Sequence, residues 1–135
     1  MPYIAECRVL RRENDSVLVY QRLDVPLLSD RDYTQRVWQT TREGPAGTTY
    51  QFKWGPANDQ GPPPKPGILR IERFDGGWLL EPNGAESTRA TFFVFTDTGE
   101  SLPPFIANSG SRGGVAKLFE AMRKRVKDPK YARDR

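Results

Sequence analysis

Alternating apolar and polar positions run through most of the chain and predict a sheet built from several short strands. The alternation is clearest in four early runs, at residues 1–10, 17–23, 31–41 and 48–54. Segments that contain turn-forming or acidic residues separate these runs, as they do between antiparallel strands. Because successive strand residues point to opposite faces, each run has one face suited to a protein interior.

The stretch 67–102 carries the strongest strand and turn signals. Residues 67–74 alternate, and the Asp-Gly-Gly that follows at 75–77 predicts a hairpin turn. Residues 78–80 would then form the return strand. A further run at residues 88–96 is dense in β-branched and aromatic side chains. We therefore expect three more strands in this part of the chain.

Helical spacing is clear only near the C-terminus. Within residues 115–126 the large apolar side chains fall on a single stripe, and charged side chains occupy much of the remaining surface. The stripe consists of Val115, Leu118, Phe119, Met122 and Val126. The Asp-Pro at 128–129 ends the pattern. The sequence therefore predicts an α+β fold, in which one long C-terminal helix follows a sheet of about six to seven strands.

Arg70 is the residue of the central stretch that fits a plain sheet least well, because it shares a face with Ile68 and Glu72. In one interpretation this face meets solvent, or Arg70 pairs with Glu72. In the other the face points inward, and the guanidinium requires an anion, a carbonyl or a polar ligand group. The pattern alone favours the first interpretation, since arginines are mostly exposed.

Length and composition fit one sheet-rich domain spanning residues 1–135. Only 36% of the residues are hydrophobic, and 12 glycines with 12 prolines suit a sheet with many turns better than a helix bundle. The sequence contains neither an apolar run of membrane-spanning length nor a basic-then-apolar layout at its start. We therefore expect a soluble, cytoplasmic protein.

The chemistry available to the chain is narrow, because it contains no histidine and a single cysteine, Cys7. The commonest zinc ligand, general base and proton shuttle are therefore missing, and Cys7 has no partner for an internal disulfide. An enzyme on this chain would have to use carboxylates, lysine, tyrosine or serine. We predict neither a metal site nor a cofactor.

The charge of +4 is concentrated at the C-terminal end, where lysines and arginines crowd residues 123–135. Such an end can contact anionic lipid or nucleic acid, but it more often is a solvated helix terminus favoured by the helix dipole. The aromatic run Tyr50, Phe52 and Trp54 could stack bases, yet core or cavity lining explains it better because no basic run accompanies it. We expect no nucleic-acid partner.

Four segments in order resemble the START (StAR-related lipid transfer) domains of the helix-grip fold. They are RDYTQR at 31–36, KPGILRIERFDGGWLLEP at 65–82, STRATFFVFTDTGESLPPFIAN at 87–108, and the helix that ends in RKRVKDPKY. The resemblance implies a curved antiparallel sheet gripping the C-terminal helix, with an apolar tunnel between them that holds one lipid. It also implies that Met1 coincides with about the fourth strand, so that the N-terminal third is missing.

The resemblance assigns roles to particular residues. It implies that Arg70 lies inside the tunnel and meets the polar end of the ligand, and that loop 24–32, with Leu27 and Leu28, acts as the gate. The proposed apolar lining consists of Phe52, Trp54, Trp78, Phe93, Phe95, Leu118, Phe119 and Met122. The sterol-binding members place an acid near the arginine from the strand matching 48–54, where this chain has Gln51 and Lys53. Sterol is thus not favoured over other lipids.

The leading hypothesis is a non-catalytic module that binds a lipid or other hydrophobic small molecule, with transfer of that ligand as an extension of the hypothesis. The open sheet edges that a missing N-terminal third would leave favour a homodimer or strand exchange, and the basic end favours transient contact with an anionic membrane surface. The alternative is an enzyme like the polyketide cyclases and aromatases of the same superfamily, which would use Glu72, Tyr50 or Arg70. A ligand-free oligomerisation module is a third hypothesis.

Overall fold

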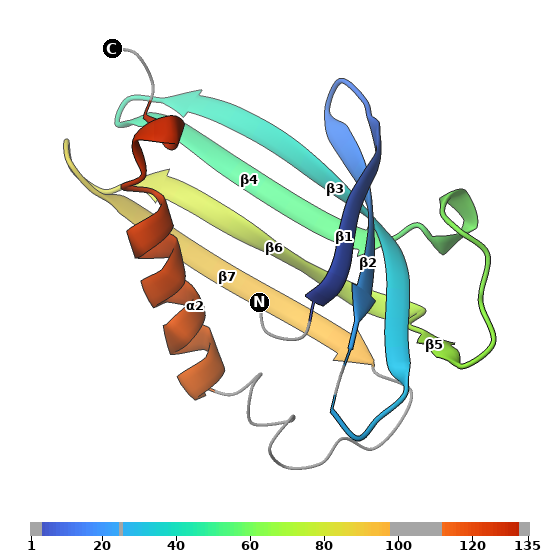
Figure 1. Ribbon diagram of the computed structural model, residues 1–135. Coiled ribbons are helices and arrows are strands. Elements are labelled where there is room, and N and C mark those ends of the chain that lie inside the picture. The colour runs from blue at the N-terminus through green and yellow to red at the C-terminus, as the bar shows by residue number, and fades with distance from the viewer. Residues whose placement is uncertain (1–3, 25, 98–111, 133–135) are drawn as a thin grey trace. The chain divides into compact units, whose positions relative to one another are not determined.

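The computed structural model describes residues 4–24, 26–97 and 112–132 (Figure 1). The chain divides into two compact units, one within residues 2–99 and the other within residues 100–135. The first unit is a β-sheet and the second contains a helix.

Over the described residues the sheet has seven strands, and six of them pair in the antiparallel order β1-β2-β3-β4-β6-β7. These six are β1 (Ile4–Arg12), β2 (Ser16–Leu23), β3 (Asp30–Gly44), β4 (Gly47–Pro56), β6 (Arg73–Pro82) and β7 (Thr88–Asp97). The short β5 (Ile68–Arg70) pairs with β3 in parallel. The predicted antiparallel sheet of six to seven strands is confirmed.

Strand β3 joins the two halves of the sheet because its 15 residues pair on both sides. Its first part, residues 31–38, pairs with β2, and its later part, residues 35–44, pairs with β4. The turn after β3 is tight, and Gly47 adopts a φ of 125° there, which an L side chain rarely adopts. In Figure 1 β1 and β2 cross the direction of β4, β6 and β7 steeply, as strong sheet twist requires.

The predicted hairpin at residues 75–77 is wrong, since β6 runs through Asp75, Gly76 and Gly77 without turning. Instead of forming a turn, the two glycines allow groups of the neighbouring strand to lie close to the β6 backbone. A Cβ on Gly76 would lie 2.4 Å from the Trp54 indole, and a Cβ on Gly77 would lie 2.4 Å from the Phe52 carbonyl oxygen. Residues 71–72, which were expected within a strand, separate β5 from β6.

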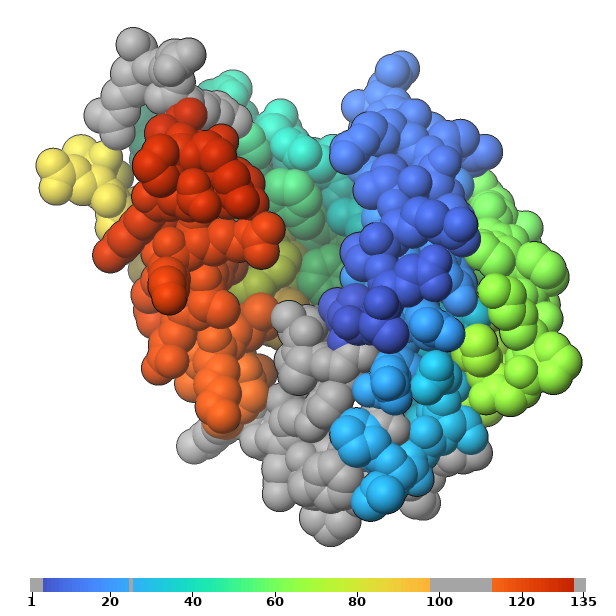
Figure 2. Space-filling model, viewed as in Figure 1, coloured from blue at the N-terminus to red at the C-terminus, as the bar shows by residue number. Residues whose placement is uncertain are grey.

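The best-buried part of the sheet lies under the connection between β4 and β5, which contains the 3-10 turn η1 (Asn58–Gln60). The backbone nitrogen of Ala57 donates to the Thr34 carbonyl at 2.8 Å, and Asn58 bonds the backbones of Thr34 and Ile71. Leu18, Tyr20 and Thr34 are almost fully buried here. In Figure 2 this green segment lies against the blue β1–β2 hairpin, where Arg11 donates to Gln60 at 2.9 Å.

The second unit contains the helix α2 (Arg112–Arg125) and the 3-10 turn η3 (Pro129–Tyr131). The helix predicted over residues 115–126 is confirmed, although it begins at Arg112. Asp128 caps η3 by accepting a hydrogen bond from the Lys130 backbone at 3.1 Å, and the adjacent proline cannot extend α2. In the described part of the chain, no helix combines the length and apolarity needed to cross a bilayer.

Candidate functional site

Strand register assembles aromatic side chains from three strands into one row. Phe52 of β4 lies opposite Trp78 of β6, which in turn lies opposite Phe92 of β7. The Trp78 and Phe92 ring centroids are 4.7 Å apart, within the range of favourable aromatic pairs. On the other side of Phe52, the row continues to Gln39 of β3. Directly opposed residues share a face, so these four side chains line one surface.

The neighbouring row is apolar as well. It runs from Val37 through Trp54 and Gly76 to Val94. The Trp54 indole extends over Gly76, where any larger residue would collide with it, and its ring lies 6.1 Å from that of Phe92. We name this surface the aromatic face and define it by Tyr50, Phe52, Trp54, Trp78 and Phe92. All five of these side chains are half-buried.

The same register places Phe93 and Phe95 on the other side of the sheet, which we name the opposite face. Phe93 lies opposite Gly77 and Phe95 opposite Asp75, and the two rings are 44% and 55% exposed. The aromatics predicted as one lining are therefore divided, because Phe93 and Phe95 lie on the other side of the sheet from Phe52 and Trp78. Trp54 belongs to the aromatic face, but its indole also borders a hollow beside Phe93. Phe92, which the sequence prediction omitted, holds the place that was given to Phe93.

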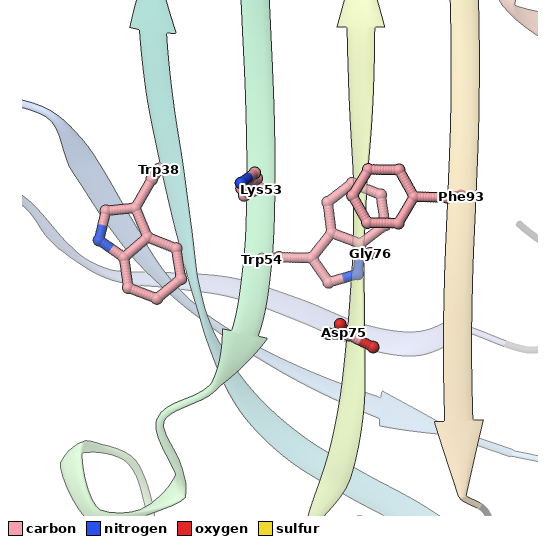
Figure 3. A pocket seen from close by; sticks show the side chains of 6 residues that line it. All are labelled: Trp38, Lys53, Trp54, Asp75, Gly76 and Phe93. Atoms are coloured by element: carbon pink, nitrogen blue, oxygen red, sulfur yellow. The ribbon is translucent and has the colours of Figure 1, made fainter.

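The opposite face carries an open hollow of about 270 Å³. Figure 3 shows Trp38 on β3 and Phe93 on β7 flanking β4 and β6, with Lys53, Asp75 and the backbone of Gly76 between them. Trp54 also borders it, through the gap that Gly76 leaves. Its volume is below the range of about 300–1,000 Å³ usual for ligand pockets, so it is a poor candidate for holding a lipid.

Arg70 is largely buried, with its side chain 11% exposed, but its partner is an acid of the protein. Its Nε donates to Asp32 Oδ1 at 2.8 Å and its Nη2 donates to the Pro62 carbonyl at 2.9 Å. Asp32 shares its face with Thr34 and Tyr20, and the Tyr20 hydroxyl donates to it at 2.9 Å. The ion pair thus lies away from the aromatic face, and we remove Arg70 from the proposed ligand contacts.

Register places the buried Arg31 on the side of the aromatic face. It lies opposite Leu23, two residues before Tyr33, and is 2% exposed. Its Nη1 donates to the Ser29 carbonyl at 2.9 Å, so it stiffens the start of β3. The sequence prediction missed this residue because β3 was expected to begin at the arginine itself, where no alternation fixes a face.

Polar but uncharged groups occupy the aromatic face toward β2. The Tyr33 hydroxyl donates to Gln21 Oε1, and Gln21 Nε2 donates to Cys7 Sγ at 3.4 Å. The Tyr33 ring packs against Phe74 with centroids 4.8 Å apart. Burial, with a smaller effect of the nearby Cys7, raises the pKa of Tyr33 to about 12. The phenol is therefore a neutral hydrogen-bonding group at physiological pH.

The proposed gate loop between β2 and β3 is described except for residue 25. Leu27 has a φ of 66° and is almost fully exposed, whereas Leu28 is half-buried. A leucine with positive φ is unfavourable, and an exposed one gains nothing from the hydrophobic effect. Both features agree with a loop that has a second conformation or a covering partner. The gate role of Leu27 and Leu28 stays a prediction.

On α2, Leu118, Phe119 and Met122 fall on the helix stripe and are half-buried. Arg123 lies over the Phe119 ring at 6.0 Å, and Arg125 Nε donates to the Tyr131 hydroxyl at 3.0 Å. That hydrogen bond lowers the pKa of Tyr131. The three apolar residues lie on one side of the helix, as residues that line a cavity must. Their role in binding stays a prediction.

The structure offers little to the catalytic alternative. Glu72 is exposed, and Arg70 is engaged by Asp32. Tyr50 lies on the aromatic face, opposite Leu80. Within residues 4–24, 26–97 and 112–132, no group of three or more acidic or cysteine side chains could hold a metal ion.

A sheet of this order followed by one C-terminal helix is a helix-grip fold. Solved structures show that it is the fold of the StAR-related lipid transfer proteins. Such a protein from Xanthomonas axonopodis matches 95% of this chain and 70% of its own, with a TM-score of 0.71 and 22% identity. Human STARD10 matches 96% of this chain and 53% of its own, with a TM-score of 0.73 and 21% identity.

Human StAR-related lipid transfer protein 5 matches 93% of this chain and 61% of its own, with a TM-score of 0.68 and 20% identity. In sequence, an uncharacterised protein of Pseudomonas aeruginosa is 31% identical over 106 residues, which are 78% of this chain. The chain spans 50% of that relative's length. No protein-family model matches. The chain therefore has the START fold, as its resemblance implied.

Proposed function

We propose that the protein binds a lipid or another hydrophobic small molecule against the aromatic face. The observation that carries this proposal is the row of Phe52, Trp78 and Phe92, which stands beside Trp54 on one side of the sheet. These rings are half-buried rather than packed into the sheet's buried core, which lies under the β4–β5 connection. Covering an apolar surface of this kind with a ligand lowers the free energy, because apolar area is removed from water.

The fold supports the proposal, since the solved proteins that share it are named for lipid transfer. Leu118, Phe119 and Met122 of α2 stay part of the proposal as apolar ligand contacts. The thioether of Met122 and the aromatic rings make a lining that adapts to different chains. The loop with Leu27 and Leu28 is the proposed entrance, which opens for loading and then covers the ligand.

The hydrophobic effect can supply the affinity without a charged contact. Burial of apolar surface yields about 25 cal/mol per Å², so that 400 Å² is worth about 10 kcal/mol before the costs of association. Those costs are about 4–15 kcal/mol, so binding is favourable overall only if much of the ligand is covered. A ligand lying across β4, β6 and β7 meets that requirement better than one in the open hollow of the opposite face.

We propose self-association through β7 as a second property. In the described sheet the outer strands are β1 and β7. They differ in how many charged side chains protect them from pairing with another chain. β1 carries Glu6, Arg8, Arg11 and Arg12, whereas β7 has no charge from residue 90 to residue 96. Charges protect an edge from pairing, so β7 is the edge suited to a second copy.

Contact of the basic residues near Arg125 with an anionic membrane surface is a further part of the proposal.

Native mass spectrometry of protein purified from cells tests the binding proposal, together with uptake of fluorescent lipid from vesicles. We expect an added mass in the lipid range that disappears on denaturation, and saturable uptake. Bare protein in the first experiment and no uptake in the second would together refute the proposal. A catalytic role would require turnover of the bound molecule, which the same spectra would reveal as a changed ligand mass.

A further inference from the structure

Glutamine side chains stand beside the aromatic rings on the aromatic face. Gln39 lies opposite Phe52. Gln35 lies four residues earlier on the same face of β3, opposite Val19 and Pro56. Gln21 lies in the next cross-strand row, opposite Tyr33. The face is therefore aromatic over β4, β6 and β7 and carries amides over β2 and β3.

Two of these amides have unused hydrogen-bonding capacity. Gln21 accepts from Tyr33 and donates to Cys7. The side chains of Gln35 and Gln39, by contrast, have no hydrogen-bond partner among the described residues, and Gln35 is half-buried. A side-chain amide offers two donors and one acceptor oxygen. These two residues can therefore bond a hydroxyl, an ester or an amide of a ligand that lies along the aromatic row.

Charged residues lie only at the margins of this face within the described strands. On β3 they are Arg31 and Glu43, each four residues beyond the glutamine nearest to it. Four strand residues span about 13 Å, too far for direct contact. Arg31 is also buried and hydrogen-bonded to Ser29. The exposed Arg12 lies at the end of the outer strand β1, two strands away from Val37.

An ionised ligand group placed beside Gln35 or Gln39 would lose water without gaining a counter-charge, which is costly. A neutral polar group would gain hydrogen bonds from the amides instead. We infer that the ligand is an uncharged amphiphile, whose hydroxyl, ester or amide end meets the glutamines of β3 while its apolar part covers Phe52, Trp78 and Phe92. This inference rests on the proposed function and names the ligand class for that site.

The test compares neutral and anionic ligands with the same acyl chains, using the full chain. Diacylglycerol is matched with phosphatidic acid, and monoacylglycerol with the fatty acid at pH 8, each offered in phosphatidylcholine vesicles. We expect the neutral member of each pair to bind at least about tenfold more tightly, since removal of an unpaired charge is favoured by more than 1.4 kcal/mol. Equal binding, or tighter binding of the anion, would overturn the inference and leave the proposed function intact. Failure of every ligand to bind would overturn both.

Substitutions then assign the preference to the glutamines. Gln39→Arg should reduce the ratio of neutral to anionic binding by at least about tenfold, because it supplies the missing counter-charge. Gln39→Leu should weaken the neutral ligands about fivefold, the effect of one hydrogen bond. The matched control is Gln51→Arg, which lies opposite Thr40 and Leu79 on the opposite face and should leave the ratio unchanged. If Gln51→Arg changes the ratio as much as Gln39→Arg does, the glutamines of β3 are not the selective groups.

Discussion

At the scale of single residues, Asp32 holds three strands together. Its carboxylate, 1% exposed, accepts hydrogen bonds from Arg70 of β5 and Tyr20 of β2. Desolvation together with this hydrogen bond raises the pKa of Tyr20, which keeps its phenol neutral. A buried carboxylate with these partners explains why so short a strand as β5 has a fixed place on β3.

We predict that Asp32→Asn destabilises the sheet by about 3–5 kcal/mol, because it leaves Arg70 buried without a counter-charge. Urea unfolding followed by tryptophan fluorescence would measure the loss. Arg73→Met is the control, since the exposed Arg73 pairs with Asp97 at 3.8 Å and such surface pairs contribute at most about 1 kcal/mol. An equal loss of unfolding free energy in both variants would contradict a stabilising role of the buried pair of Asp32 and Arg70.

Tyr33 gives a prediction about pH. Burial raises its pKa to about 12 in the folded protein, whereas an unfolded tyrosine ionises near pH 10. The folded state therefore favours the neutral phenol, and this stabilisation is complete below about pH 10 and is lost as the pH rises toward 12. Tyr33→Phe should lose less stability across that window than the parent does. Urea midpoints from pH 9 to 12, with phenolate absorbance, would measure the difference, and identical profiles would refute it.

At the scale of elements, β6 depends on its two adjacent glycines. Each is covered on its own face by an aromatic ring, Gly76 by Trp54 and Gly77 by Phe93. Glycine weakens a strand unless something packs over it, and here the rings occupy the space that side chains would fill. Asp75-Gly76-Gly77 is a turn signal in the local sequence, and the rings that override it come from other strands.

Gly76→Ala should destabilise the sheet by about 1–3 kcal/mol, since its methyl group would overlap the Trp54 indole. The indole must move, so tryptophan fluorescence of the folded protein should change as well. Gly113→Ala in α2 is the control. Apart from the adjacent residues and the backbone of the helix itself, no described atom lies within 4 Å of the added Cβ, and alanine favours helix by up to about 1 kcal/mol. A neutral Gly76→Ala would show that Trp54 does not lie over the strand.

The edge of β7 gives a prediction about association. Phe95→Lys places a charge in its uncharged stretch, and it should lower the fraction of dimer in sedimentation velocity over a concentration series. Val9→Lys on the outer strand β1 is the matched control, since Val9 is also exposed and its neighbour Arg8 already protects that edge. A monomer at all concentrations, or equal effects of the two lysines, would contradict pairing through β7.

At the scale of the whole molecule, the sequence predicted the fold class and the location of most strands and of α2, because alternation and helical spacing are local properties. It could not assign a partner to Arg70, since Asp32 lies 38 residues away and only β5 pairing joins them. It also chose the wrong face of β7, because Phe93 and Phe95 were predicted to line the cavity. Phe92, Phe93, Val94 and Phe95 are all apolar, so no alternation distinguishes the two faces, and only pairing with β6 does.

In the proposed binding mode one face of the sheet binds the ligand and the other does not. The measurement that tests it most directly is the uptake of one fluorescent lipid by Trp78→Ala and by Phe95→Ala, with melting curves to establish that both fold. Loss of a buried aromatic contact should weaken binding by Trp78→Ala about tenfold, whereas Phe95→Ala should stay within about twofold of the parent. An equal loss in both variants, or a loss confined to Phe95→Ala, would contradict the account.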